Sequence, residues 1–206
     1  MLNFLLKSEN TIIAISSLLG LLISALLSVE LHEIAHGAVA LWCGDRTAKN
    51  AGRISLNPVR HFELTGILML LLAGFGWAKP VPVNPDNFKN RKRGIVLVSL
   101  AGIVTNIILV FVFFGLLNLA QAAMKGITIW TTGLELFILS FYYFSLYGMI
   151  INISLAAFNL LPIYPLDGFR VLEALFPNSK YCAFMRRRGM LILLILVAVS
   201  FILGRY

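Results

Sequence analysis

The sequence predicts an all-α polytopic membrane protein with about four transmembrane helices and one short re-entrant or interfacial segment. Of its 206 residues, 59% are hydrophobic and only 13% are charged, and the mean hydropathy is +0.89. A water-soluble domain could not hide so much apolar surface in its interior. A transmembrane helix needs about 20 residues, and four apolar segments approach or exceed that length: residues 11–43, 94–120, 134–160 and 189–205.

The first of these segments is expected to remain in the protein as a span. The residues before it lack the strongly basic leader of a signal peptide, and its helical periodicity continues past Val29 to Cys43. The connections between the segments are too short to hold a soluble module of the PDZ or nucleotide-sensing type. We therefore expect a single transmembrane domain over residues 1–206. Cys43 and Cys182 have no motif spacing, so both are expected to be free thiols.

A fifth apolar run, residues 64–75, is too short to cross a bilayer and has basic residues on both sides. Lipid tolerates a segment that does not span only where the protein shields its backbone. We therefore expect a re-entrant or interfacial element there. We further hypothesise that residues 64–85 offer an edge to which an extended substrate adds as a strand.

The basic residues orient the predicted spans. Three connections, residues 44–61, 77–93 and 164–188, carry 14 of the 17 Lys and Arg residues, whereas residues 121–133 carry only Lys125. By the positive-inside rule these three connections face the cytoplasm, and both termini lie outside. The net charge of +8 then indicates contact with anionic lipid head groups and not with nucleic acid, because the basic residues lie between apolar runs.

Two histidines and a glutamate stand in the first span, in the sequence HEIAH (residues 32–36). If this helix reaches the inner membrane boundary near Cys43, His36 and His32 lie about 10 and 16 Å deep, at about 1.5 Å per residue. Polar side chains at such depth are costly and usually mark function. The alternative interpretation is a structural pair of histidines that hydrogen-bond to neighbouring spans.

The spacing of these residues suits metal-dependent hydrolysis. His32 and His36 are four residues apart, so both imidazoles lie on one helix face and can bind one Zn²⁺, while Glu33 can reach a water molecule on that ion. Zinc lowers the pKa of bound water toward about 7, and a carboxylate takes the proton as the water attacks a carbonyl carbon. We therefore expect one zinc ion per chain.

A catalytic zinc usually has three protein ligands, and the histidine pair leaves the third open. His61 lies in a basic connection where a solvated or interfacial side chain is favoured, and Glu63 and Glu173 are further candidates.

Asp167 is the preferred third ligand. It stands in FNLLPIYPLDGFRVL (residues 158–172), where Pro162 and Pro165 break the third long helix and Gly168 permits an unusual backbone, so that Asp167 is presented from irregular structure. The predicted topology brings Asp167 to the same side of the bilayer as the histidines. For this residue alone, an ordinary Asp-Gly turn is the alternative.

Together these motifs resemble the site-2 proteases, zinc metalloproteases that cut substrates within or next to the membrane. HEIAH on an early span and the late NLLPIYPLDG carry the resemblance, and GWAKPVPVNPDNFKNRKRG with SLAGIVTN is similar to the compact prokaryotic subgroup without PDZ or CBS domains. The resemblance implies that zinc is bound by His32, His36 and Asp167, that Glu33 is the catalytic base, and that Asn159 orients the substrate or the oxyanion.

Four other positions bear on this prediction. The amide of Asn159 can donate to a carbonyl oxygen as charge develops on it, although its residue type suits an interhelical hydrogen bond equally well. Asn106 is expected to serve packing first. Glu30 points away from the face of His32 and is expected to be protonated or paired with a basic residue. Ile103 stands where the family usually has proline, which concerns the local helix bend and not the zinc site.

Two other functional classes could use the same residues. A membrane zinc transporter usually needs a second open pathway and further acidic or histidine groups at the midplane, which the sequence lacks. A catalytically inactive scaffold would keep the metal for stability. The favoured function is therefore proteolysis of a transmembrane protein or peptide in the cell membrane, with an active site that opens toward the cytoplasm.

Overall fold

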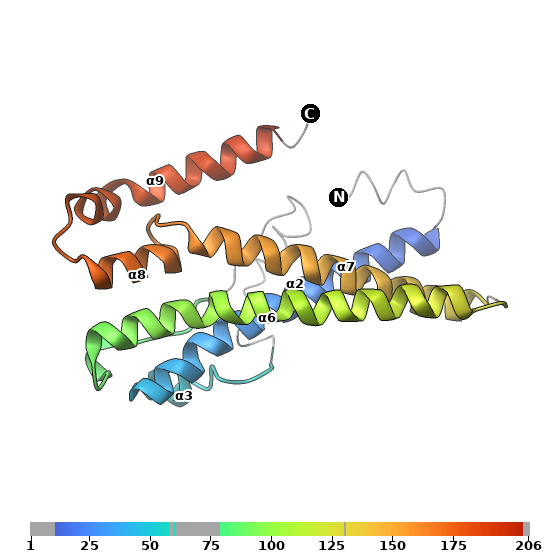
Figure 1. Cartoon of the computed structure of the whole chain (residues 1–206), viewed down its shortest axis with the longest axis horizontal. Coiled ribbons are helices and arrows are strands. Elements are labelled where there is room, and N and C mark those ends of the chain that lie inside the picture. Colours follow the sequence, from blue (N-terminus) through green and yellow to red (C-terminus); the bar gives the residue numbers. More distant parts are fainter. Residues whose placement is uncertain (1–10, 58–59, 61–78, 130, 204–206) are drawn as a thin grey trace.

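The structure is a computed structural model of the whole chain, and it describes residues 11–57, 60, 79–129 and 131–203. These residues form helices and no strand, so the predicted all-α fold is confirmed. The predicted re-entrant run at 64–75 and His61 lie outside the described residues. The helices, labelled in Figure 1, are α2 (Thr11–Cys43), α3 (Thr47–Asn50), the 3-10 helix η1 (Pro85–Asn87), α6 (Arg91–Gly126), α7 (Thr132–Leu160), α8 (Asp167–Leu175) and α9 (Lys180–Leu203).

Three of the described helices, α2, α6 and α7, are long and apolar enough to cross a membrane. They contain three of the four predicted spans. The fourth, residues 189–205, lies mostly in α9, which is not among these three helices. Arginines at positions 186–188 interrupt the first half of α9, so only its second half is continuously apolar. A fourth crossing stays a prediction.

The three spanning helices pack closely on one another. Helices α6 and α7 lie side by side, and α2 crosses them obliquely (Figure 1). A Cβ atom at Gly20 of α2 would lie only 2.5 Å from the backbone nitrogen of Phe144 in α7. Lipid provides no hydrophobic driving force between helices, so this close approach of backbones contributes directly to their association.

Several polar residues are buried in the interior of this bundle beside apolar ones such as Phe113, and many large apolar side chains are exposed. Ser16, Ser28 and Asn152 are fully buried, and the amide nitrogen of Asn152 donates to the hydroxyl oxygen of Ser28 at 2.7 Å. Phe111 and Phe137, by contrast, are mostly exposed. This distribution suits a lipid solvent, in which apolar surface needs no burial but polar groups must find partners inside the protein.

The predicted break after the third long helix is confirmed, with one difference. Helix α7 ends at Leu160, and the peptide bond between Tyr164 and Pro165 is cis. Asp167 was expected to stand in irregular structure, but it is the first residue of helix α8. The helix dipole stabilises a carboxylate in the first turn, so a helix can begin at this aspartate as soon as the prolines have been passed.

Helices α8 and α9 share a small apolar core formed by Ile163, Leu166, Phe169, Cys182 and Met185. Helix α8 also contacts α6, which ties the start of α8 to the spanning bundle. Cys182 is buried in this core and Cys43 is half-buried at the end of α2. Both are free thiols, as expected from the sequence.

The chain before α6, residues 79–90, is attached to the end of α2. The backbone N–H of Lys89 donates to the carbonyl oxygen of Cys43 at 3.0 Å. The side chain of Phe88 packs with Ala40 of α2 and Val98 of α6. Residues 79–90 therefore lie against both helices near the histidine pair.

Candidate metal centre

Two imidazole rings meet on one face of α2. His32 and His36 are 6% and 8% exposed, and their Nε2 atoms are 3.0 Å apart. The spacing of four residues puts the rings on the same face, and their planes meet almost edge to face, at 86°. Both Nε2 atoms thus face a common point.

Asp167 reaches the same point from α8. The residue is 7% exposed, and its Oδ2 atom lies 3.4 Å from Nε2 of His32 and 3.2 Å from Nε2 of His36. The structure therefore brings together the three residues that the sequence selected as metal ligands. Within the described part of the chain, they form the one cluster of three or more His, Cys, Asp or Glu side chains that could hold a metal ion.

The hydrogen bonds of the two Nδ1 atoms determine which nitrogen of each imidazole carries the proton. Nδ1 of His32 lies 2.9 Å from Oδ1 of Asn106, and Nδ1 of His36 lies 2.7 Å from the carbonyl oxygen of Val98. Both oxygens are acceptors, so each Nδ1 carries a proton and donates it. In a neutral ring, Nε2 then presents a lone pair. Three electron-pair donors, two nitrogens and a carboxylate oxygen, therefore face one another.

A divalent cation fits between these three atoms. Zinc bonds of about 2.0–2.2 Å in tetrahedral geometry separate the ligand atoms by about 3.3–3.6 Å. The observed separations are 3.0, 3.2 and 3.4 Å, close to that size. Hydrogen bonds from both Nδ1 atoms also hold the rings in the orientation that ligating histidines require. Donor type, spacing and ring orientation thus all suit zinc.

The packing of α6 against His32 depends on Gly102. A Cβ atom at this position would lie 2.4 Å from Cε1 of His32 and 2.7 Å from each ring nitrogen. Any side chain here would displace the imidazole. Asn106, one turn further along α6, is fully buried. Its amide oxygen accepts a hydrogen bond from the His32 ring, which packs against Gly102.

Glu33 stands beside the three ligands and is held from outside its own helix. It is half-buried, and its Oε2 atom accepts a hydrogen bond from the backbone N–H of Val81 at 2.8 Å. A carboxylate offers two oxygens with two lone pairs each. This bond therefore positions Glu33 and leaves it able to accept a proton.

Arg53 fixes the backbone next to Val81. Its side chain is buried, and its guanidinium donates to the carbonyl oxygens of Lys79 and Pro80. These carbonyls belong to the two residues that precede Val81. The backbone N–H of Val81, which donates a hydrogen bond to Glu33, therefore belongs to a constrained segment of the chain.

Asp45 fixes the other end of residues 79–90. It is fully buried, and its carboxylate accepts from the backbone N–H of Asn84 and from the side-chain amide of Asn87, both at 2.7 Å. The backbone N–H and the hydroxyl of Thr47 donate to it as well. Burial acts to raise the pKa of Asp45, but these hydrogen bonds outweigh it and hold the pKa below its usual value.

The described cluster of three candidate ligands does not include the other predicted residues. The amide nitrogen of Asn159 donates to the carbonyl oxygen of Leu155 at 3.0 Å, one turn back in α7. Glu173 forms an ion pair with Arg186. Glu30 is buried but does not belong to the metal cluster. Glu63 lies outside the described residues.

Three groups that hold His32, His36 or Glu33 were not predicted from the sequence to do so. Asn106 was expected to serve packing, although an amide at membrane depth four residues after a glycine is a usable signal. The Val98 carbonyl and the Val81 N–H are backbone groups, so their residue types carry no signal.

The model of Peptidase family M50 matches residues 20–203, a range that includes all three candidate ligands and Glu33. The chain belongs to Peptidase family M50. The resemblance to the site-2 proteases is thereby confirmed, and the chain is a zinc metalloprotease.

Two curated relatives have similar sequences. "Putative zinc metalloprotease YwhC" of Bacillus subtilis (strain 168) is 46% identical over 158 residues, which are 76% of this chain and 69% of that protein. "Putative zinc metalloprotease MJ0611" of Methanocaldococcus jannaschii is 31% identical over 144 residues, which are 69% of this chain and 63% of that protein. No solved structure gives a significant match.

Replacing Gly102 should weaken the metal centre. Gly102→Ala places a methyl group against the His32 ring, so zinc affinity should fall about 10- to 100-fold, as when an orienting contact of a ligand is lost. Competition with a chelator measures this affinity. Gly115→Ala, at a position on the same helix with no atom nearby, is the control. Equal affinity of the two variants would contradict the packing argument.

Replacing Asp45 should act on Glu33 without removing the metal. Asp45→Asn weakens the anchoring of residues 79–90, so the rate of peptide cleavage should fall about tenfold or more while zinc stays stoichiometric. Asn118→Ala, at an exposed site on α6, is the control. Parallel loss of zinc and activity would show that Asp45 supports the fold and not the position of Glu33.

Lowering the pH should reduce the difference in the free energy of unfolding between Asp45→Asn and wild type. The folded-state pKa of Asp45 is lowered, so its contribution to folding stability is present above the unfolded-state pKa, about 3.9, and is lost as pH falls through the folded value. Chemical denaturation at neutral and at acidic pH measures the effect.

Proposed function

We propose that this chain is an intramembrane zinc protease that hydrolyses peptide bonds of transmembrane protein or peptide substrates. In this proposal one zinc ion is held by His32, His36 and Asp167, and Glu33 is the general base. One observation carries it: three buried electron-pair donors, two from a spanning helix, converge to within 3.4 Å of one another. Membership of Peptidase family M50 supplies the reaction class.

Each protein group has a defined chemical part in this mechanism. Bound zinc would lower the pKa of a water molecule toward about 7 and polarise the substrate carbonyl. Glu33 accepts the proton that the water loses and then gives it to the amine nitrogen that leaves. Asn106 and the Val98 carbonyl keep both imidazoles in the tautomer with a free Nε2, because each accepts the Nδ1 proton.

Asn159 is proposed to orient the substrate or its oxyanion. It is half-buried in the last turn of α7, eight residues before Asp167. Its amide nitrogen carries two hydrogens, and the bond to Leu155 uses one of them. The second can donate to a substrate carbonyl oxygen as negative charge develops there.

The location of the ligands favours a transmembrane substrate. His32 and His36 lie within α2, a helix that can span the membrane. A transmembrane peptide exposes backbone amides when it unwinds for cleavage, and these amides need a polar environment that hydrocarbon does not provide. A water-containing site at this depth meets that need.

The site is proposed to open toward the cytoplasm, with both termini outside. Arg91, Lys92 and Arg93 begin α6, and Arg53 and Lys79 lie near the end of α2. Basic residues gather on the cytoplasmic side of spans, so this end of the bundle is assigned to that side. The attachment of Val81 to Glu33 also supports the hypothesis of substrate strand addition at residues 64–85, for the described residues 79–85.

Glu33→Gln should abolish cleavage and leave zinc in place. The amide keeps the shape of the side chain but cannot accept the proton, so the rate of cleavage of a transmembrane peptide in vesicles should fall by about 10²- to 10⁴-fold. Metal content is measured on the same samples. Glu135→Gln, in the first turn of α7, is the matched control. Unchanged cleavage in the Glu33 variant would refute the proposed base.

Asp167→Ala should remove the metal. Loss of one of three protein ligands leaves two imidazoles, so zinc should be lost to a mild chelator that the wild-type protein withstands. Asp86→Ala, at an exposed aspartate, is the control for the loss of a carboxylate. Equal zinc retention in the Asp167 variant and wild type would exclude Asp167 as a ligand.

A further inference from the structure

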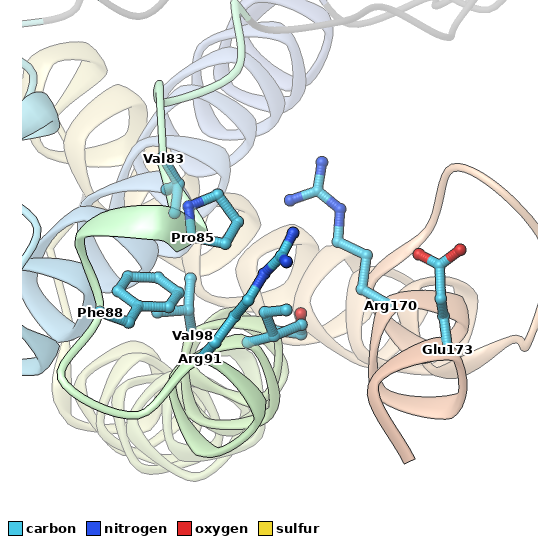
Figure 2. Close-up of a pocket in the computed structure, with 9 residues that line it drawn as sticks. Val83, Pro85, Phe88, Arg91, Val98, Arg170 and Glu173 are labelled. Atoms are coloured by element: carbon cyan, nitrogen blue, oxygen red, sulfur yellow. The ribbon is translucent and has the colours of Figure 1, made fainter. Parts of the chain in front are cut away.

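A pocket with a volume of about 290 Å³ lies between residues 79–90, the first turns of α6 and helix α8 (Figure 2). Apolar and charged side chains share its wall. The lining residues are Val83, Pro85, Phe88, Arg91, Ile95, Val98, Ser99, Arg170 and Glu173.

Two walls of the pocket contain residues that contact a proposed metal ligand or share a helix with one. Val98 lines the pocket, and its carbonyl oxygen accepts the hydrogen bond from His36. Arg170 lies three residues after Asp167 on α8, so the two share one side of that helix. A peptide that reaches the metal centre therefore has this pocket beside it.

The third wall belongs to the segment that donates a hydrogen bond to Glu33, the proposed base. Val83 lines the pocket two residues after Val81, whose N–H donates to Glu33. Pro85 and Phe88 follow on the same stretch of chain, on one side of the pocket in Figure 2. All three elements that hold the site thus contribute to one pocket.

Two arginines dominate the charge of the pocket. Arg91 and Arg170 extend into it from α6 and α8 (Figure 2). The Nη2 atom of Arg91 lies 3.6 Å from Oδ1 of Asp86, but both side chains are at least 70% exposed. An exposed ion pair of this kind is weak. The carboxylate of Glu173 is held by Arg186. The pocket therefore offers two guanidinium groups to an incoming anion.

The helix ends strengthen this positive potential. Arg91 is the first residue of α6, and Arg170 lies in the first turn of α8. The N-terminus of a helix carries partial positive charge, so a cation is disfavoured there and an anion is stabilised. The helix ends therefore add to the positive potential of the two guanidinium groups.

We infer that this pocket is a substrate subsite that binds an acidic side chain close to the scissile peptide bond, with Arg91 and Arg170 as the residues that determine this specificity. The inference rests on the proposed proteolytic function. A peptide is favoured over a lipid because all three walls belong to elements that hold the site. The volume of about 290 Å³ lies just below the range for ligand pockets, about 300–1,000 Å³, and suits one or two side chains.

The first test needs only the wild-type protein. Synthetic transmembrane peptides of one sequence carry Asp, or Asn in its place, at successive positions on both sides of the cleaved bond. In phosphatidylcholine vesicles, kcat/KM should be about tenfold higher for Asp than for Asn at one position, because guanidinium groups bind carboxylates with charge-assisted hydrogen bonds. Equal cleavage of acid and amide at every position would overturn the inference.

The second test assigns the preference to the two arginines. In the R91Q/R170Q protein the ratio of kcat/KM for the acid to that for the amide should fall to about one. The K92Q/R187Q control removes the same charge outside the pocket lining and should keep the wild-type ratio. R91E/R170E should reverse the preference in favour of a lysine peptide. An equal fall in both double variants would assign the preference to general surface charge and overturn the inference.

A binding measurement separates this inference from the proposed function. Fluorescent Asp and Asn peptides are titrated onto the Glu33→Gln protein, and the Asp peptide should bind about tenfold more tightly. If no peptide is cleaved by wild type but this difference is found, the proposed function fails and the subsite stands. If cleavage occurs without any difference between the two peptides in cleavage or binding, the subsite fails alone. Competition by phosphatidylglycerol vesicles in place of the Asp peptide would assign the pocket to lipid and refute the inference.

Discussion

Two imidazole nitrogens and one carboxylate oxygen, pointed at one another inside a helical bundle, are the constraint on which the rest of this structure depends. Burying any one of these groups without a partner is costly. Hydrogen bonds from both Nδ1 atoms leave the Nε2 atoms of the neutral rings as acceptors, so neutral His32 and His36 cannot donate to each other or to the carboxylate of Asp167. A cation bound among these three electron-pair donors would attract all of them and so offset their mutual repulsion. In the proposed site, bound metal would therefore help to make this polar cluster compatible with an apolar environment.

Helix α6 supports this cluster through three positions spaced four residues apart. Val98 supplies a carbonyl oxygen to His36, Gly102 supplies the space for the ring of His32, and Asn106 supplies an amide oxygen to that ring. The spacing places all three on one face of α6. One helix face thus fixes both rings, and a rotation or shift of α6 would disturb both at once. The small and polar residues that are buried in the bundle, such as Ser28 and Asn152, meet the same need for close and satisfied contacts.

The local features of this protein could be predicted from the sequence, whereas the supporting contacts could not. Hydropathy located the spans of α2, α6 and α7, and the four-residue spacing put His32 and His36 on one face, because both signals depend only on neighbouring residues. The proline break indicated where the chain turns back with Asp167. The contacts of Asn106 and Asp45 depend on how distant helices and loops meet, and no single-residue pattern encodes such a meeting. A backbone donor such as the Val81 N–H has no residue signature at all.

The proposed metal ligands and the proposed base, Glu33, are held by different parts of the chain. Helices α6 and α8 fix the ligands, whereas residues 79–90 hold Glu33 through Val81 and are themselves fastened by Arg53 and Asp45. The same residues form one wall of the pocket. Under the proposed function, a peptide in the pocket would contact the same segment that holds Glu33. Substrate contact and the alignment of Glu33 would then depend on one element, which Arg53 and Asp45 keep in place.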